Sequence, residues 1–289
     1  MIRTILVPTS GSGTDEVVFA TALALGRACA AHLQFVHVHL EPVTAALAVR
    51  HVEFCAAPAY SRELERLREQ GDQLAGGARK HFEKFCSAQK VEIRDKPGVV
   101  EAVTASFSEE GDEPVKRLLS HARHCDLIVL GRRHHRDHLP SGLIETLLMD
   151  SGRPIVIAHE VVPQSLTGTI VVGWKETREA ARALAAALPL LKEAKRVVLL
   201  GIAEEGAASR EAFDDLACQL AWHGVHAEIE IVGNASCLAT TLLPLAVAQL
   251  RADLLVVGGF GRSPLLECVF GGVTQVLLEH AELPLFMLH

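Results

Sequence analysis

The sequence predicts an α/β protein made of two tandem doubly wound domains, each with a five-stranded parallel sheet flanked by helices. Three observations support this prediction. The chain has 289 residues, about twice the length of a common domain. Short apolar runs alternate with helical patterns, and the runs are continuous, which is typical of parallel strands buried on both faces. The two halves of the chain also resemble each other in sequence.

The internal repeat is clearest at the start and at the end of each half. The matching pairs are TILVP with TIVVG (4–8 and 169–173), DLIVLG with DLLVVG (126–131 and 253–258), and SGLIETLLMDSGRP with GGVTQVLLEHAELP (141–154 and 271–284). The last pair aligns without gaps. We therefore expect a duplication with domains at 1–160 and 168–289, joined by a short polar segment between them.

The second half shows the predicted order of elements most plainly. Its apolar runs predict strands, and the Ala/Leu-rich stretches between them predict helices. The most apolar long stretch, 238–260, carries Arg251 and Asp253 in its interior, so it is too short to cross a membrane and predicts a buried helix followed by a buried strand. We expect strands near 169–173, 196–202, 226–232, 253–257 and 284–288, and helices near 178–192, 209–223, 236–251 and 272–281.

The first half follows the same order with a longer middle. The charged, amphipathic stretch 64–85 predicts a long surface helix, and EAVTASF at 101–107 predicts the third strand. Both halves finish on an apolar strand, which leads to His159 in one and to His289 in the other. Because exposed strand edges invite pairing, we expect these strands to join the halves as an intramolecular pseudo-dimer. A homodimer is compatible with the chain.

Composition and charge narrow the class of protein. With 28 Lys and Arg against 35 Asp and Glu, the net charge of −7 argues against nucleic-acid binding through a broad basic surface. Seven scattered cysteines without a CxxC pair suit a reducing compartment. The apolar run near the N-terminus is too short for a signal-peptide core. We therefore expect a cytoplasmic protein with no membrane partner.

The strongest functional signal is the loop GGFGRSPLLECVFGGVT at 258–274, after the fourth strand of the second half. In doubly wound sheets ligands bind beyond the carboxyl ends of the strands, where the first and fourth strands should be neighbours. Glycines let a backbone approach phosphate oxygens, and the start of the next helix offers N–H groups to an anion. A turn that only closes the strand–helix corner is the alternative. The predicted nucleotide-binding residues here are Gly258, Gly261, Arg262, Gly271, Gly272, Val273 and Thr274.

This loop resembles that of the nucleotide-binding universal stress proteins, which carry G-x2-G-x9-G-(S/T) after the fourth strand. Here the spacing is Gly258-x2-Gly261-x9-Gly271, with Gly272 where Ser or Thr is usual. The resemblance covers essentially the whole chain as two copies. It implies a five-stranded parallel-sheet domain, often dimeric, which in some members binds ATP or another adenine nucleotide, with Mg²⁺ only alongside ATP. Most members have no established enzymatic reaction, and their role is cytosolic stress resistance.

Two departures from the family pattern bear on binding. Nucleotide-binding relatives usually place an acidic residue just after the first strand, near the adenosine, whereas the matching positions here are Ser10 and Lys175. Lys175 would instead approach a phosphate. Gly272 lacks the usual hydroxyl, and the loss of one hydrogen bond costs roughly 0.5–1.5 kcal/mol, which weakens binding without abolishing it.

The corresponding loops of the first half are degenerate. GRRHHRDHLPSG at 131–142 is three residues shorter than its partner and has His134 where Gly261 stands, so it is not expected to wrap a triphosphate. Its cationic run 132–138 is interpreted as a solvated surface loop or an anion patch, and adjacent arginines disfavour a metal site. SGSGTD at 10–15 looks like a phosphate loop, but its residues suit a helix N-cap that needs no ligand.

The sequence therefore predicts a non-enzymatic stress-response protein whose second domain binds an adenine nucleotide, with no catalytic residue and no metal site assigned. One alternative is a slow ATP hydrolase or nucleotidyl-transfer activity at 258–274. It would need a metal-holding acid that neither Ser10 nor Lys175 supplies. The other alternative is a nucleotide-independent module that binds a protein or a small ligand.

Overall fold

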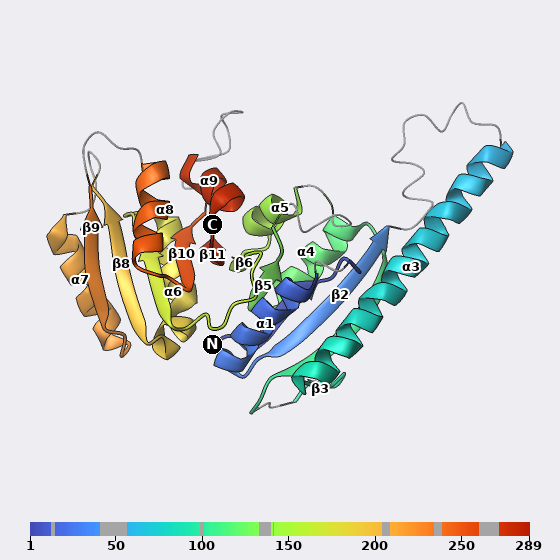
Figure 1. Cartoon of the computed structure of the whole chain (residues 1–289), viewed down its shortest axis with the longest axis horizontal. Helices are drawn as coiled ribbons and strands as arrows, with labels where there is room; N and C mark the ends of the chain where they lie inside the picture. The colour runs from blue at the N-terminus through green and yellow to red at the C-terminus, as the bar shows by residue number, and fades with distance from the viewer. Residues whose placement is uncertain are drawn as a thin grey trace.

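The computed structural model describes residues 1–12, 15–40, 57–98, 101–132, 140, 142–203, 209–233, 239–259 and 272–289. Its elements alternate between strands and helices in both halves (Figure 1). The first half contains β1 (Thr4–Pro8), α1 (Asp15–Cys29), β2 (His32–Leu40), α3 (Ala57–Gln89), β3 (Glu92–Ile93), β4 (Thr104–Asp112), α4 (Pro114–His124), β5 (Leu127–Leu130), α5 (Leu143–Asp150) and β6 (Ile155–Ile157). The second half contains β7 (Thr169–Gly173), α6 (Arg178–Glu193), β8 (Arg196–Ile202), α7 (Arg210–Trp222), β9 (Ala227–Val232), α8 (Ala239–Gln249), β10 (Leu254–Gly258), α9 (Gly272–His280) and β11 (Leu285–Leu288).

All strands of the described residues lie in one sheet, in the order β3-β4-β2-β1-β5-β6-β11-β10-β7-β8-β9. Within each half every pair of neighbouring strands is parallel. The halves meet where β6 pairs antiparallel with β11, with Ile157 opposite Leu285 and Ile155 opposite Met287. These are the terminal strands that the sequence analysis singled out. The join makes the two sheets continuous, as Figure 1 shows.

Helices cover both faces of the sheet, which explains why its strands are apolar on both sides. One core contains buried residues of α1, α3, α6 and α7, and the other contains buried residues of α4, α5, α8 and α9. Each core draws on both halves of the chain. The central strands β5 and β11 are buried at every position, as expected for parallel strands enclosed between two helix layers. The predicted fold class is confirmed.

The second half has the five strands that the sequence predicts, with boundaries that agree within one residue, whereas the first half differs at its edge. Its third long strand, β4, starts at Thr104 and continues to Asp112, beyond the apolar run at 101–107. The reason is that β4 pairs with β2 along its whole length, from His32 to Leu40, so backbone pairing carries the strand through the polar residues SEEGD. The short edge strand β3 was not predicted.

The long helix α3 is amphipathic, as its sequence predicts, and extends over 57–89 instead of 64–85. Ala75, Ala78, Phe82 and Cys86 are buried at helical spacing. Phe82 contacts Phe35 of β2, with ring centroids 5.1 Å apart. This contact fixes α3 across the first half of the sheet.

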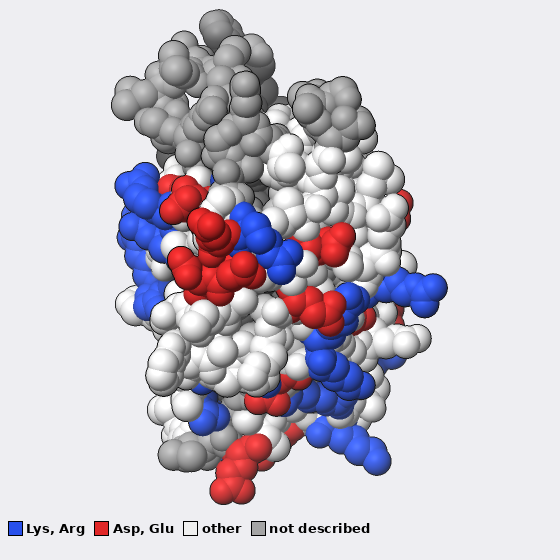
Figure 2. All heavy atoms as spheres, turned by 90° about the vertical axis from the view of Figure 1, so that its left-hand side faces the viewer, with Lys and Arg blue, Asp and Glu red and all other residues white. Residues whose placement is uncertain are grey.

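The opposite edge of the sheet, at β9, carries charged side chains. Glu228 and Glu230 are exposed there, and Arg196 of β8 holds Glu228 with nitrogen and oxygen 2.7 Å apart. Figure 2, which faces this side, shows basic and acidic side chains interspersed among uncharged ones. Charges on an edge strand disfavour pairing with another chain.

Candidate functional site

Each half contains one point where the order of its strands reverses. In the first half β1 lies between β2 and β5, and in the second half β7 lies between β8 and β10. The strand that opens each half is thus next to the strand ending in the DLIVLG or DLLVVG repeat, as the sequence analysis expected. The loops after these strands are the candidate ligand sites, because ligands of such sheets bind beyond the carboxyl ends at the reversal.

In the first half, polar groups of the loop after β1 donate hydrogen bonds to a carboxylate of the same chain. Asp15, which is 4% exposed, accepts hydrogen bonds from the Ser10 N–H at 3.1 Å, the Gly11 N–H at 2.9 Å and the Ser10 hydroxyl at 2.7 Å. Burial raises the pKa of Asp15, and these hydrogen bonds oppose that rise. A phosphate would have to displace this carboxylate from the Ser10 and Gly11 N–H groups. The predicted N-cap role includes Thr14, which lies outside the described residues.

The same loop is covered by α3. Gly11 has φ of +79°, and a Cβ atom at this position would collide with the backbone carbonyl of Leu74. In return, a Cβ atom on Gly77 would lie 3.1 Å from the Gly11 carbonyl oxygen. Two glycines therefore allow the loop and the helix to touch backbone to backbone. The loop after β1 and α3 thus touch although these residues lie about sixty positions apart in the sequence.

In the second half the end of β10 touches the first turn of α6. A Cβ atom on Gly258 would lie 2.5 Å from the Ala180 backbone nitrogen and 3.0 Å from the Cβ atom of Glu179. Because the nearest of these atoms belong to the backbone, no side-chain movement would relieve the clash. Glycine at 258 thus brings the strand end and the helix start together at the reversal point.

Glu179 is an acidic residue in the first turn of α6, next to Gly258, and the sequence analysis did not single it out. It is 4% exposed and lies 3.3 Å from the Arg178 guanidinium. Burial favours its neutral form, but hydrogen bonds from its own N–H and from Thr177, with the charge of Arg178, lower its pKa below the ordinary value. A Ser/Thr cap followed by an acid in the first turn was the available signal, here Thr177 and Glu179.

Lys175 lies in the tight turn between β7 and α6. The Thr177 N–H donates to the Lys175 carbonyl at 2.7 Å, and the Trp174 N–H donates to Leu200 of β8 at 2.9 Å. Thr177 then caps α6 by accepting from the Ala180 N–H at 3.3 Å. The exposed Lys175 is thus held at the carboxyl edge of the sheet, close in sequence to the crevice.

The start of α9 supplies the other described part of the predicted site. Gly272 is exposed and opens the helix, Val273 is half-buried, and Thr274 lies on the buried face with Leu277. A Cβ atom on Gly272 would make only ordinary contact, 3.6 Å from the Thr240 methyl group. The described neighbours of this position therefore leave room for a side chain. The three remaining predicted residues lie outside the described residues: Gly261, Arg262 and Gly271.

Arg132 is the one described member of the cationic run 132–138. It is 3% exposed and donates from Nη2 to the carbonyl oxygens of Ala281 and Leu283, the latter at 3.3 Å. Burial lowers its pKa, and Glu160 opposes that shift. Arg132 thus links the first half to the segment between α9 and β11.

Two general features of the described residues concern possible partners. Within these ranges, His, Cys, Asp and Glu side chains form no group of three or more that could hold a metal ion. Within the same ranges, none of the helices combines the length and apolar character needed to cross a membrane.

Comparisons with known proteins agree with the fold. The family model described as the universal stress protein family matches residues 1–151 and again 150–289. A universal stress protein from Archaeoglobus fulgidus DSM 4304 has a TM-score of 0.63 and 16% identity, over 99% of this chain and 95% of that one. A candidate universal stress protein from Pseudomonas aeruginosa UCBPP-PA14 has a TM-score of 0.54 and 16% identity, over 99% and 93%. A search of curated proteins found no significant match.

At these identities the solved structures establish the fold alone. The family model matches each half separately, and the two matches together span the chain. The protein therefore belongs to the universal stress protein family, as a tandem two-domain member.

Proposed function

We propose that this protein acts in cytosolic stress resistance as a non-enzymatic binding protein, whose second domain takes an adenine nucleotide between β7 and β10. The observation that carries the proposal is the difference between the two crevices. In the first, Asp15 and α3 occupy the loop after β1. In the second, the helix at the corresponding place is α7, which has 13 residues, whereas α3 has 33. Gly258 is in close contact with the start of α6 there.

The described residues indicate how the nucleotide would lie. The backbone at Gly258 and the N–H groups at the start of α9 offer contacts to phosphates. The carboxylate of Glu179 already occupies the positive end of α6. We therefore expect the phosphates to lie toward α9, and Mg²⁺ to accompany ATP because it offsets the repulsion from Glu179.

Calorimetric titration with ATP, ADP and AMP, with and without Mg²⁺, tests this proposal. We expect one site per chain with affinity on the order of micromolar. A Gly261→Glu variant should lose binding, because it places a carboxylate in the glycine loop. The matched control is His134→Glu, at the aligned position of the first half, which should bind like the unmodified protein. Equal binding by Gly261→Glu would refute the assignment to the second half.

Glu179 also gives a specific reason to test a second function, slow ATP hydrolysis. It is a buried carboxylate on a residue next to Gly258, the kind of group that the sequence analysis found lacking for a metal. Hydrolysis would produce ADP only with Mg²⁺, and both Gly261→Glu and Glu179→Gln would abolish it. Our proposal predicts instead that nucleotide binds without ADP production above the protein-free rate. If no nucleotide binds in the titration, the result would favour a module that binds a protein or another ligand.

A further inference from the structure

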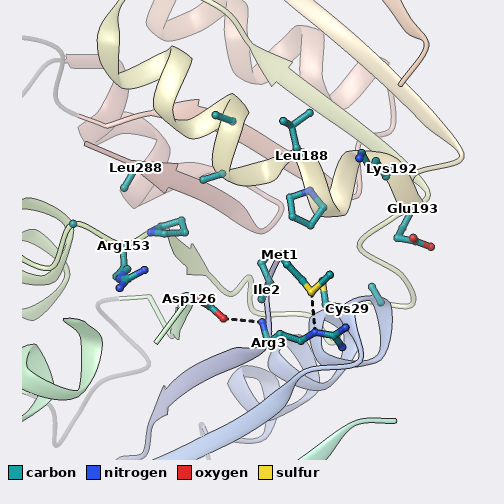
Figure 3. A pocket seen from close by; sticks show the side chains of 16 residues that line it. Met1, Ile2, Arg3, Cys29, Asp126, Arg153, Leu188, Lys192, Glu193 and Leu288 are labelled. Atoms are coloured by element: carbon teal, nitrogen blue, oxygen red, sulfur yellow. Dashed lines mark hydrogen bonds between the residues drawn. The ribbon is translucent and has the colours of Figure 1, made fainter. Parts of the chain in front are cut away.

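A cavity of about 680 Å³ lies between the two halves. It is bounded by the segments that lead into β1, β5 and β6, by the end of α1, and by one side of α6 (Figure 3). The ends of β1, β5 and β6 at the cavity are amino ends, whereas Leu288 lies at the carboxyl end of β11 and pairs with Gly258. The size falls within the roughly 300–1,000 Å³ of small-molecule sites.

The second half contributes an amphipathic stripe of α6. Ala185, Leu188, Pro189 and Lys192 follow one another at helical spacing and line the cavity. The opposite side of the helix is buried in the core through Ala187 and its neighbours. Leu188 of the stripe also packs against this core, and the exposed Lys192 lies at the end of the stripe.

The first half contributes two arginines and a carboxylate that already accepts hydrogen bonds from neighbouring residues. Asp126 accepts from the Arg3 N–H at 2.8 Å, the Thr4 N–H at 3.0 Å and the Thr4 hydroxyl at 3.3 Å. Arg3 donates its guanidinium N–H groups to the sulfur of Met1 and the carbonyl of Ala30. Arg153 donates to the Arg123 carbonyl at 3.0 Å. Within the described part of the chain, the acceptors of these guanidinium bonds are uncharged.

The charges of the lining are positive on balance in a chain that is negative overall. Three cations, Arg3, Arg153 and Lys192, face two acids, Asp126 and Glu193, whereas the whole chain carries −7. Figure 3 shows Arg153 and Lys192 at opposite sides of the cavity, with Leu188 between them. An apolar floor with cations at its margins suits a molecule that has an apolar body and a negative group.

We propose that this cavity binds a small aliphatic carboxylate, with its chain on Leu188 and Pro189 and its carboxylate held by Arg153 or Lys192. Because the lining comes from both halves, the bound molecule would hold α6 against the entry to β1 and β6. Binding would therefore raise the stability of the folded chain by mass action.

Non-covalent binding is expected although Cys29 lines the cavity. Burial, with the nearby charge of Glu193, raises the pKa of the Cys29 thiol to about 11. The thiolate, which is the nucleophilic form, is thus scarce at neutral pH. Cys29 serves as an apolar part of the wall.

Titration calorimetry with octanoate, octan-1-ol and acetate tests the proposal, because the three probes separate the apolar body from the charge. Octanoate should bind at least about tenfold more tightly than either of the others, since one charge-assisted contact or a buried chain contributes that much. Octanoate should also raise the melting temperature, and high salt should weaken its binding.

Variants with matched controls place the site. Lys192→Gln and Arg153→Gln together should weaken octanoate binding about tenfold, whereas Lys195→Gln with Arg123→Gln, exposed positions outside the lining, should leave it unchanged. Ala185→Phe should weaken octanoate binding because its ring fills the cavity. Its control is Ala181→Phe, one turn earlier on the same helix and exposed, which should leave octanoate binding unchanged. Gly261→Glu should bind octanoate normally, which separates this proposal from the nucleotide site.

Three results would overturn the proposal. They are equal binding of octanol and octanoate, no effect of the charge and cavity variants, and no octanoate binding up to millimolar concentrations. The first would show that the cations of the cavity do not contribute to binding of the carboxylate. The second would place octanoate elsewhere, and the third would exclude this class of ligand.

Discussion

Restoring the family's hydroxyl at Gly272 should strengthen nucleotide binding. Gly272 stands where nucleotide-binding relatives carry Ser or Thr, and its place at the start of α9 is open. Among the described residues, the nearest atom to an added Cβ is the Thr240 methyl group at 3.6 Å, an ordinary van der Waals contact. We therefore expect Gly272→Ser to add a hydroxyl without a clash with these residues. One new hydrogen bond contributes roughly 0.5–1.5 kcal/mol, so the dissociation constant should fall about two- to tenfold.

The matched control is Gly272→Ala, which adds the same Cβ and the same loss of backbone freedom without the hydroxyl. Both variants and the unmodified protein would be titrated with ATP and Mg²⁺ in one buffer. The expected order of affinity is serine above alanine, with alanine close to glycine. If the serine and alanine variants bind the nucleotide alike, the hydroxyl does not contact it. The role inferred for this position from the family pattern would then be wrong.

Three further predictions follow from contacts of the described residues. Gly258→Ala should destabilise the fold by about 1–3 kcal/mol in urea unfolding, because its Cβ meets the α6 backbone. Gly71→Ala, with open space around it in α3, should be neutral or stabilising. Glu179→Gln should lower stability by about 1 kcal/mol at pH 7. Since the folded-state pKa of Glu179 is lowered, that difference should shrink as pH falls below 4.5, and the exposed Glu176→Gln should show no such trend. Arg132→Ala should cost about 1–3 kcal/mol in the same assay, because two carbonyls at the junction lose their donor, and a smaller loss would mean that water replaces it.

Local patterns were sufficient to predict most elements of the second half. Strands such as β8 at 196–202 and helices such as α6 at 178–193 follow apolar runs and capping residues that act over a few positions. The predicted end of β4 was wrong because its polar residues are ordered by pairing with β2, a contact that no local pattern records. The same limit explains why β3, with two exposed residues, was missed.

The candidate sites were harder to predict because they depend on contacts between distant segments. The glycine spacing located the loop near Gly258, but the closure of the first crevice needs Gly11 and Leu74 to meet. Glu179 was overlooked because the family pattern directs attention to the residue after the first strand, here Lys175. The cavity at α6 involves residues of both halves, which the antiparallel join of β6 and β11 and the packing of α1 against α6 bring together.

The duplication explains how the two crevices came to differ. In a homodimer of one-domain chains, a substitution that lets a helix cover one pocket covers both, because one sequence serves both copies. Here the halves are encoded separately, so their contacts can differ. Gly11 and Gly77 let α3 pack against the loop after β1 in the first half, and Gly258 lets the end of β10 pack against α6 in the second. The first half gains contacts between the loop after β1 and α3, and we propose that the second half binds the ligand. This asymmetry leads us to expect one nucleotide per chain, where two equivalent halves would bind two.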